Sequence, residues 1–272
     1  MLNFKPIAYF VDLDGTLLDE PKTKEKISNE NIEYMKKLND SGTHVIISTG
    51  RGNSDFVMSL AKKINSKYVI CQNGGLIVDI DNNILRRVEM DANMTQKIAE
   101  ILKLDNMFIT FSSGNKIYGN KSKMKTIRPW VKNLELLPYS EMTEFKPATK
   151  VLAFGKLTKC GIKKVKNKLQ KVFPDLCVDI ISKGYAVEIT IHDATKGAGN
   201  KYVCDEILKI DIKKTVHFGD SGNDISTVDY NGAFVAMKNG MRNVKKAATW
   251  VANSYKNAGV KRAIEKIISS NN

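Results

Sequence analysis

Short apolar, β-prone runs alternate with helix-like segments in the first part of the chain, and this alternation restricts the possible folds more than any other feature. The runs are residues 7–11, 44–49 and 68–71. Between the first and second runs, Ile32, Met35 and Leu38 lie on one helical stripe that ends at Gly42. Between the second and third runs, residues 54–63 predict another helix. Continuous apolar runs are typical of strands buried on both faces, so this order predicts a parallel sheet with right-handed crossovers.

The pattern changes after Asn73-Gly74-Gly75. Residues 76–78 and 84–88 predict a hairpin around 81–83, and an irregular mixture of helix-like and strand-like segments follows. This mixture is typical of an α+β domain rather than of a continued parallel sheet.

Beyond Lys196 the first pattern resumes. The segments are a helix at 199–208, strands at 215–218 and 233–236, and a helix at 260–268. We therefore predict an α/β protein with a Rossmann-like parallel-sheet core built from residues 1–82 and 191–272, and an α+β domain inserted at 83–190.

The composition predicts a soluble protein of the cytoplasm. The 272 residues are long for one domain and sufficient for two. No apolar run approaches the roughly 20 residues that span a bilayer, and the start of the chain lacks the plan of a signal peptide. The four cysteines are scattered, so free thiols in a reducing compartment are expected rather than disulfides or a zinc site. We expect a monomer.

The net charge of +14 is the one unusual value in the composition. It can attract phosphorylated metabolites, nucleic acid or acidic membranes. The lysines are dispersed, however, and no interleaving of aromatic and basic residues of the kind that stacks bases is visible. Solvated helix faces are the simpler interpretation, and nucleic-acid binding is not favoured.

Asp12-Leu13-Asp14-Gly15-Thr16 directly follows the first predicted strand. Side chains two apart on an extended chain point the same way, so both carboxylates would face the carboxyl edge of the sheet, where open parallel sheets bind ligands. Crowded carboxylates repel each other, which raises one pKa or requires a cation. The pair suits an aspartate nucleophile with a proton shuttle, although a simple turn would also explain this segment.

Three further polar clusters lie at or near predicted strand ends. Ser48-Thr49-Gly50-Arg51 can hold a phosphate, although strand-Thr-Gly is also a common turn. Thr195-Lys196-Gly197 supplies a lysine that can neutralise a phosphoryl group, but any single lysine among 43 basic residues is weak evidence. Gly219-Asp220-Ser221-Gly222-Asn223-Asp224 gathers the hard oxygen ligands that Mg²⁺ requires, or forms a turn.

Together and in this order, the four clusters resemble the motifs of the haloacid-dehalogenase (HAD) superfamily of phosphotransferases. The matching positions are Asp12-x-Asp14-Gly15-Thr16, Thr49, Lys196 and Gly219-Asp220-x-x-Asn223-Asp224. Further segments narrow the resemblance to the Cof-type phosphatases, which carry a large type IIB α/β cap; they are 48–51, 73–75, 235–239 and 259–260. The resemblance spans essentially the whole chain. Its departures, at Thr227, at Asn239-Gly240 and in 191–196, remove no catalytic group and bear on local packing and substrate fit.

The resemblance implies a Mg²⁺-dependent phosphatase that acts on small phosphorylated metabolites. Asp12 would attack the phosphorus and form an aspartyl-phosphate, and Asp14 would protonate the leaving oxygen and then deprotonate water. Lys196 would be the third catalytic residue. The implied metal ligands are Asp12, the backbone carbonyl of Asp14, Asp220 and Asp224, and the implied phosphate-binding residues are Thr49, Gly50, Arg51, Asn73 and Asn223.

The inserted domain would close over the site and select the leaving group. Candidates for its lining are Asn73, Arg86 or Arg87, and Lys150, although a surface or fold-supporting role is the simpler interpretation of each. His217 lies inside an apolar strand, and we predict a hydrogen-bonded core histidine there rather than a ligand.

Two other functions stay open. One is a narrower enzyme of the same superfamily, either a sugar-phosphate phosphatase dedicated to one metabolite or a phosphomutase, although nothing in the sequence indicates a second phosphate site. The other is a nucleic-acid-binding or regulatory protein on the same fold that uses its positive charge as the working surface. The complete set of catalytic positions argues against the second.

Overall fold

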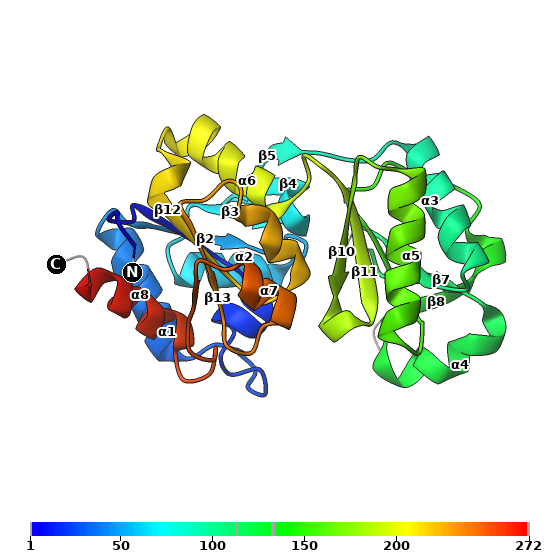
Figure 1. Cartoon of the computed structure of the whole chain (residues 1–272), viewed down its shortest axis with the longest axis horizontal. Helices are drawn as coiled ribbons and strands as arrows, with labels where there is room; N and C mark the ends of the chain where they lie inside the picture. Colours follow the sequence, from blue (N-terminus) through cyan, green and yellow to red (C-terminus); the bar gives the residue numbers. More distant parts are fainter. Residues whose placement is uncertain (1, 113, 132–133, 271–272) are drawn as a thin grey trace. The chain divides into compact units, whose positions relative to one another are not determined.

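The computed structural model describes residues 2–112, 114–131 and 134–270, which divide into two compact units (Figure 1). The first unit combines the N-terminal segment up to Arg87 with the C-terminal segment from Thr195, and the second runs from Val88 to Ala194. Residues 84–87, which the sequence pattern placed in the insertion, form a strand of the first unit.

The described residues of the first unit form an eight-stranded sheet with the order β14-β13-β12-β1-β2-β3-β4-β5. It is parallel from β14 through β3 and antiparallel at β4 and β5. The strands are β1 (Ala8–Val11), β2 (His44–Ser48), β3 (Tyr68–Cys71), β4 (Leu76–Asp79), β5 (Ile84–Arg87), β12 (Thr215–Gly219), β13 (Ala233–Ala236) and β14 (Trp250–Val251). The predicted parallel-sheet core is confirmed.

Helices cover both faces of this sheet, which explains why its strands are continuously apolar. Successive side chains of a strand point to opposite faces, so Tyr9 and Val11 pack with α1 (Asn29–Asp40), α2 (Asp55–Lys63) and α8 (Gly259–Ser269). Ala8 and Phe10 pack on the other face against the helical segment Val203–Leu208, which continues α6 (Lys196–Tyr202). On that same face, α7 (Arg242–Ala247) covers β13.

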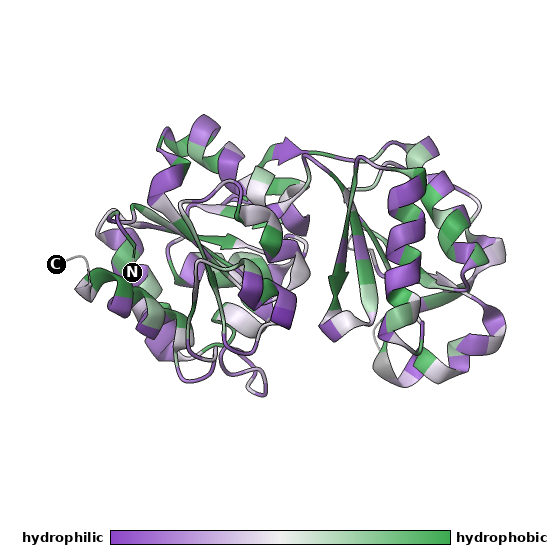
Figure 2. Cartoon of the chain, viewed as in Figure 1, coloured by the Kyte–Doolittle hydropathy of each residue, from purple (hydrophilic) through white to green (hydrophobic). Residues whose placement is uncertain are grey.

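The second unit is an α+β layer with the sheet order β10-β11-β9-β6-β7-β8, antiparallel except between β7 and β8. The inner faces of α3 and α5 share one hydrophobic cluster with the sheet. Figure 2 shows mostly hydrophilic residues along the visible side of α5 and hydrophobic residues in the neighbouring strands β10 and β11. The elements are α3 (Ala92–Leu104), β6 (Phe108–Phe111), β7 (Lys116–Gly119), α4 (Met124–Ile127), β8 (Glu135–Pro138), β9 (Val151–Phe154), α5 (Lys159–Val172), β10 (Leu176–Ile181) and β11 (Ala186–Ile191).

The strand register brings the predicted site residues to one edge of the first sheet. Val11 of β1 pairs with Phe218 of β12 on one side and with Ile47 of β2 on the other. Because these three strands are parallel, the residues that follow them emerge at the same carboxyl edge. Among the helices that the structure describes, none has the length and apolar character that crossing a membrane requires.

Candidate active site

Asp12 extends β1 by one residue before the chain turns. Its backbone N–H donates to the Phe218 carbonyl at 3.0 Å, and only 6% of the residue is exposed. The residues Leu13–Leu17 form a wide turn in which Gly15 has φ +81°. A Cβ at Gly15 would lie 2.3 Å from Asp220 Oδ2, so glycine permits both this backbone conformation and the close approach of Asp220.

Lys196 places a positive charge between two aspartates. Its Nζ donates to Asp12 Oδ1 at 2.6 Å and to Asp224 Oδ1 at 2.7 Å, and its side chain is fully buried at the start of α6. Thr195 caps this helix by accepting from the Ala198 N–H. Burial opposes the charged form of Lys196, but the two carboxylates outweigh it and raise the pKa, so the ammonium stays charged.

Asp224 uses both of its carboxylate oxygens to organise the loop after β12. Oδ2 accepts the backbone N–H groups of Asp220 and Ser221, each at 2.9 Å, while Oδ1 accepts Lys196 and lies 2.9 Å from His217 Nε2. Burial alone would raise the pKa of Asp224, but Lys196 and His217 outweigh it and hold the pKa well below its usual range. Asp224 is therefore a permanently ionised anchor for the lysine.

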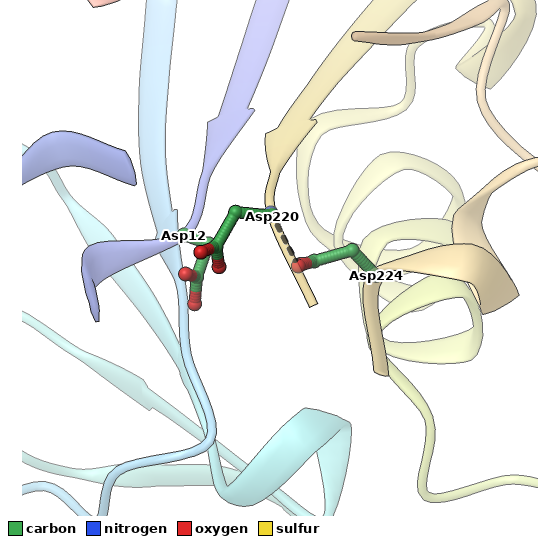
Figure 3. A group of neighbouring side chains, drawn as sticks. All are labelled: Asp12, Asp220 and Asp224. Carbon is green, nitrogen blue, oxygen red and sulfur yellow. Dashed lines mark hydrogen bonds between the residues drawn. The ribbon is translucent and has the colours of Figure 1, made fainter. Parts of the chain in front are cut away.

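Asp12, Asp220 and Asp224 form a carboxylate cluster in which one oxygen of each lies within 4.8 Å of the others. Figure 3 shows the carboxyl groups of Asp12 and Asp220 beside one another, with Asp224 directed at the Asp220 backbone. Burial raises the pKa of Asp12 to about 8, an effect that Lys196 opposes and that Asp224 and Asp220 reinforce. Burial, with Asp224 next in effect, raises the pKa of Asp220 to about 7.

The donor set of this cluster fits a divalent cation. Among the described residues, Asp12 Oδ2 and Asp220 Oδ1 receive no hydrogen bond from the protein, whereas each oxygen of Asp224 already accepts two. Asp12 is buried and Asp220 is partly buried, and a bound cation would stabilise the ionised form of two such neighbouring carboxyl groups with raised pKa values. Asp12 and Asp220 thus have the greater capacity for a metal, and Asp224 borders the site.

The candidate phosphate-binding residues meet around the same edge. Thr49 is buried, and its Oγ1 accepts the Arg51 N–H at 3.2 Å. Asn223 Nδ2 donates to Asn73 Oδ1 at 2.9 Å, which joins the loop after β12 to the loop after β3. Gly50 lies in the turn between Thr49 and Arg51.

Arg51 contacts a carboxylate in this structure. Its Nε and one terminal nitrogen donate to the two oxygens of Asp14, both at 2.6 Å, and the two side chains remain 32% and 58% exposed. The guanidinium also lies 5.2 Å from the centre of the Phe56 ring. The sequence pattern foresaw both residues at the site but not their pairing.

The weaker sequence candidates have other partners. Lys150 lies in the second unit, where its Nζ donates to Glu188 at 2.6 Å, and the Arg86 guanidinium lies 4.9 Å from the Tyr202 ring centre. His217 is a buried, hydrogen-bonded core residue as predicted, although its contact with Asp224 was not foreseen.

Asn239 is a site residue that sequence reasoning missed. Its Nδ2 donates to the Gly15 carbonyl at 2.8 Å and to Asp220 Oδ2 at 3.2 Å. It therefore joins the turn after β1 to Asp220 of the carboxylate cluster. Its position shortly after the predicted strand 233–236 was the available signal, since such positions gather at the carboxyl edge.

A parallel-sheet core that presents a buried cluster of aspartates and a lysine at its carboxyl edge is an arrangement suited to a hydrolase built on an α/β sheet. The chain belongs to the haloacid dehalogenase-like hydrolases, whose family model matches residues 9–264. The predicted membership of the HAD superfamily is confirmed, and the protein is a phosphatase of this family. A structure from Plasmodium vivax described as HAD/COF-like has the same fold, with a TM-score of 0.78 at 20% identity, covering 98% of this chain and 97% of that one.

Relatives of known name and structure match over nearly the full length. The chain is 27% identical to the 5-amino-6-(5-phospho-D-ribitylamino)uracil phosphatase of Bacillus subtilis, covering 95% of this chain and 97% of that protein. It is 28% identical to the phosphoglycolate phosphatase of Methanobrevibacter smithii, covering 98% and 100%. A HAD phosphatase structure from Bacteroides thetaiotaomicron superposes with a TM-score of 0.80 at 22% identity, covering 96% and 95%, and shows the same fold.

Proposed function

We propose that this phosphatase is Mg²⁺-dependent and hydrolyses small phosphate monoesters through an aspartyl-phosphate on Asp12. The observation that carries the proposal is the state of Asp12. One of its oxygens is paired with Lys196 and the other receives no hydrogen bond from the described residues, directly beside Asp220. This is the arrangement that a carboxylate nucleophile needs, because it must be charged, fixed and accessible to phosphorus.

Asp12 performs the first step. A carboxylate oxygen forms a bond to phosphorus while the bond from phosphorus to the ester oxygen breaks on the opposite side. Lys196 stabilises the ionised form of Asp12 before the step and offsets the negative charge of the phosphoryl oxygens during it. Water then attacks the phosphorus of the aspartyl-phosphate, the bond from phosphorus to Asp12 breaks, and inorganic phosphate leaves as the Asp12 carboxylate is restored.

Asp14 moves the proton in both steps. It protonates the departing ester oxygen and later removes a proton from the attacking water. The paired hydrogen bonds from Arg51 hold the Asp14 carboxylate in place. A phosphate that attracts Arg51 would loosen this pair and leave the Asp14 carboxyl group free to face the departing ester oxygen.

The residues that would hold Mg²⁺ are Asp12 and Asp220, together with the backbone carbonyl of Asp14, and with Asp224 at the border of the site. When bound there, Mg²⁺ supplies positive charge that offsets the repulsion between the anionic nucleophile and the anionic ester. Thr49, Gly50, Asn73 and Asn223 would position the phosphoryl oxygens, and the hydrogen bond between Asn73 and Asn223 fixes two of these groups in advance.

The substrate class follows from two relatives and from the charge of the chain. The names of the Bacillus and Methanobrevibacter enzymes both denote phosphate esters of small organic molecules. A net charge of +14 favours the approach of such anions. We assign the choice of leaving group to the second unit, Val88–Ala194, acting as a cap. Release of phosphate from a panel of sugar phosphates, nucleotides, phosphoglycolate and cofactor phosphates, with and without Mg²⁺, tests this assignment.

Removing divalent cations with EDTA is expected to abolish phosphate release, and Mg²⁺ is expected to restore it. Mg²⁺ binding at pH 7 should also release protons, because the cation-free pKa of Asp12 is about 8 and that of Asp220 is about 7, and both ligands must be ionised. The affinity for Mg²⁺ should therefore weaken as the pH falls below 7 and level off above 8. Titration calorimetry in two buffers of different ionisation enthalpy measures the protons, and binding without proton release would contradict the ligand assignment.

Replacing Asp14 by Asn is expected to lower kcat by about 10²- to 10⁴-fold for alkyl phosphates, because the leaving alkoxide then receives no proton. The loss in the first step should be much smaller for p-nitrophenyl phosphate, whose leaving group departs unprotonated. Burst kinetics with the two substrates on the same preparation provide the comparison. An equal loss in the first step for both would mean that Asp14 positions groups rather than moves a proton.

A further inference from the structure

A connected set of buried polar side chains leads from Asp224 into the interior of the first unit. His217, in the middle of β12, has no exposed surface, and its Nε2 lies 2.9 Å from Asp224 Oδ1. Its Nδ1 lies 3.2 Å from Asn200 Nδ2 on α6. The set continues through Asn200 Nδ2 to Asn231 Oδ1 at 3.0 Å, Asn231 Nδ2 to Thr215 Oγ1 at 2.8 Å, and Ser48 Oγ to Asn200 Oδ1 at 3.1 Å.

The donors and acceptors of this set fit one arrangement of protons. A carboxylate accepts, so Nε2 of His217 carries the hydrogen that faces Asp224, and Nδ1 accepts from the Asn200 amide. The second amide hydrogen of Asn200 goes to Asn231, and its carbonyl oxygen accepts the hydroxyl of Ser48. Burial also lowers the pKa of His217 against the opposing effect of Asp224, which keeps the ring neutral.

The hydrogen bonds of His217 determine the position of Asp224 Oδ1, the oxygen that accepts from Lys196. Asp224 Oδ1 accepts both Lys196 and His217, so the position of the ammonium beside Asp12 depends on the point at which His217 holds that oxygen. Packing alone would be satisfied by an apolar side chain at this position, because the cross-strand neighbours of His217, Phe10 and Phe234, are buried and apolar. Burying polar side chains costs free energy unless each of them has a hydrogen-bond partner. A network in which all are paired can hold its residues in one geometry.

We propose that His217 is a positioning residue for phosphoryl transfer, which with Asn200 fixes Asp224 and thereby sets Lys196 against Asp12. This inference rests on the proposed roles of Asp12 and Lys196. It differs from a purely structural role in one respect: the loss of His217 lowers the rate of the chemical step in a protein that is still folded.

The test compares His217→Leu and His217→Gln with Asn39→Ala. Leucine removes the donor to Asp224, so kcat should fall by about 10- to 100-fold with KM little changed, as is typical when the partner of a site residue is lost. A glutamine amide can donate to Asp224 and accept from Asn200, so His217→Gln should recover most of the kcat. Asn39 binds backbone groups of Val45 and Ile64, remote from the carboxyl edge, so Asn39→Ala should lower Tm without lowering kcat.

Three outcomes would overturn the proposal: a folded His217→Leu enzyme with the kcat of the wild type, a His217→Gln enzyme no better than His217→Leu, or an equal kcat loss in Asn39→Ala. If His217→Leu does not fold, Asn200→Leu replaces it. This variant keeps the contact between His217 and Asp224 but removes the group that fixes the ring, so a smaller loss of kcat is still expected, and no loss would overturn the proposal.

Nitrogen-15 NMR of the histidine rings separates this proposal from the proposed function. The His217 ring should be neutral near pH 7 and should carry its proton on Nε2, the nitrogen that faces Asp224. Phosphate release by the wild type combined with a proton on Nδ1 would overturn the positioning role alone. A wild type that releases phosphate from no ester, with the expected ring signals, would overturn the phosphatase mechanism and the positioning role that rests on it.

Discussion

Replacement of Asp12 by Asn is expected to reduce phosphate release by at least about 10⁴-fold, because removing a nucleophile leaves only binding and charge stabilisation to act on the ester. The side chain keeps its size, so the fold should persist. Initial rates with saturating Mg²⁺ measure the loss. Acid quenching of a reaction with ³²P-labelled substrate should trap label on the wild-type protein, releasable by hydroxylamine, and none on the variant.

Asp19→Asn is the matched control for this variant. Asp19 is another buried aspartate of the first unit, but its oxygens accept from Ser28 and from the Ala258 N–H rather than from the cluster. The change should lower stability and leave kcat near that of the wild type. Full Mg²⁺-dependent activity in Asp12→Asn would refute the aspartyl-phosphate mechanism.

Replacement of Lys196 by Met is expected to abolish activity and to lower the free energy of unfolding by about 3–5 kcal/mol, as is typical when one partner of a buried ion pair is removed. The ammonium is fully buried between Asp12 and Asp224, so its loss leaves two carboxylates without their counter-charge. Urea unfolding followed by circular dichroism, alongside phosphate release, measures both effects.

The double variant Lys196→Met/Asp224→Asn separates stability from catalysis. Removing the charge of Asp224 leaves one carboxylate, that of Asp12, without its counter-charge instead of two. Part of the lost stability should therefore return while activity remains absent. Recovery of activity together with stability would show that Lys196 only supports the fold. No recovery of stability would mean that the loop after β12 requires the charge of Asp224 to hold its backbone N–H groups.

The strands of the core could be predicted because their apolar runs differ from the segments around them. The observed bounds of β2 and β3, His44–Ser48 and Tyr68–Cys71, follow the predicted ones closely. The two-residue strand β14 was missed because so short a segment has no period. The hairpin of β4 with the edge strand β5 was predicted, but the largely exposed β5 was assigned to the insertion, because the sequence pattern alone does not show at which residue one unit ends and the next begins.

The residues that form the site could be predicted from the sequence, but the hydrogen bonds between their side chains could not. Asp12 and Asp220 were placed at one edge because strand order and direction fix where strand ends emerge, whereas Lys196 was assigned to the site by the resemblance to the HAD motifs. The pairing of Arg51 with Asp14 and the hydrogen bond between Asn73 and Asn223 depend on loop conformation, which spacing does not encode.

The pairing of β1 with β12 has a consequence for the order in which the molecule can form. Ala8–Val11 is synthesised early, but its neighbour Thr215–Gly219 leaves the ribosome only after the whole of Val88–Ala194 has emerged. The contiguous unit can collapse through contacts of short sequence separation, whereas the core must close a loop of some two hundred residues, which slows its assembly. Asp12 therefore meets Lys196 and Asp224 late, and a nascent or truncated chain is expected to contain no competent catalyst.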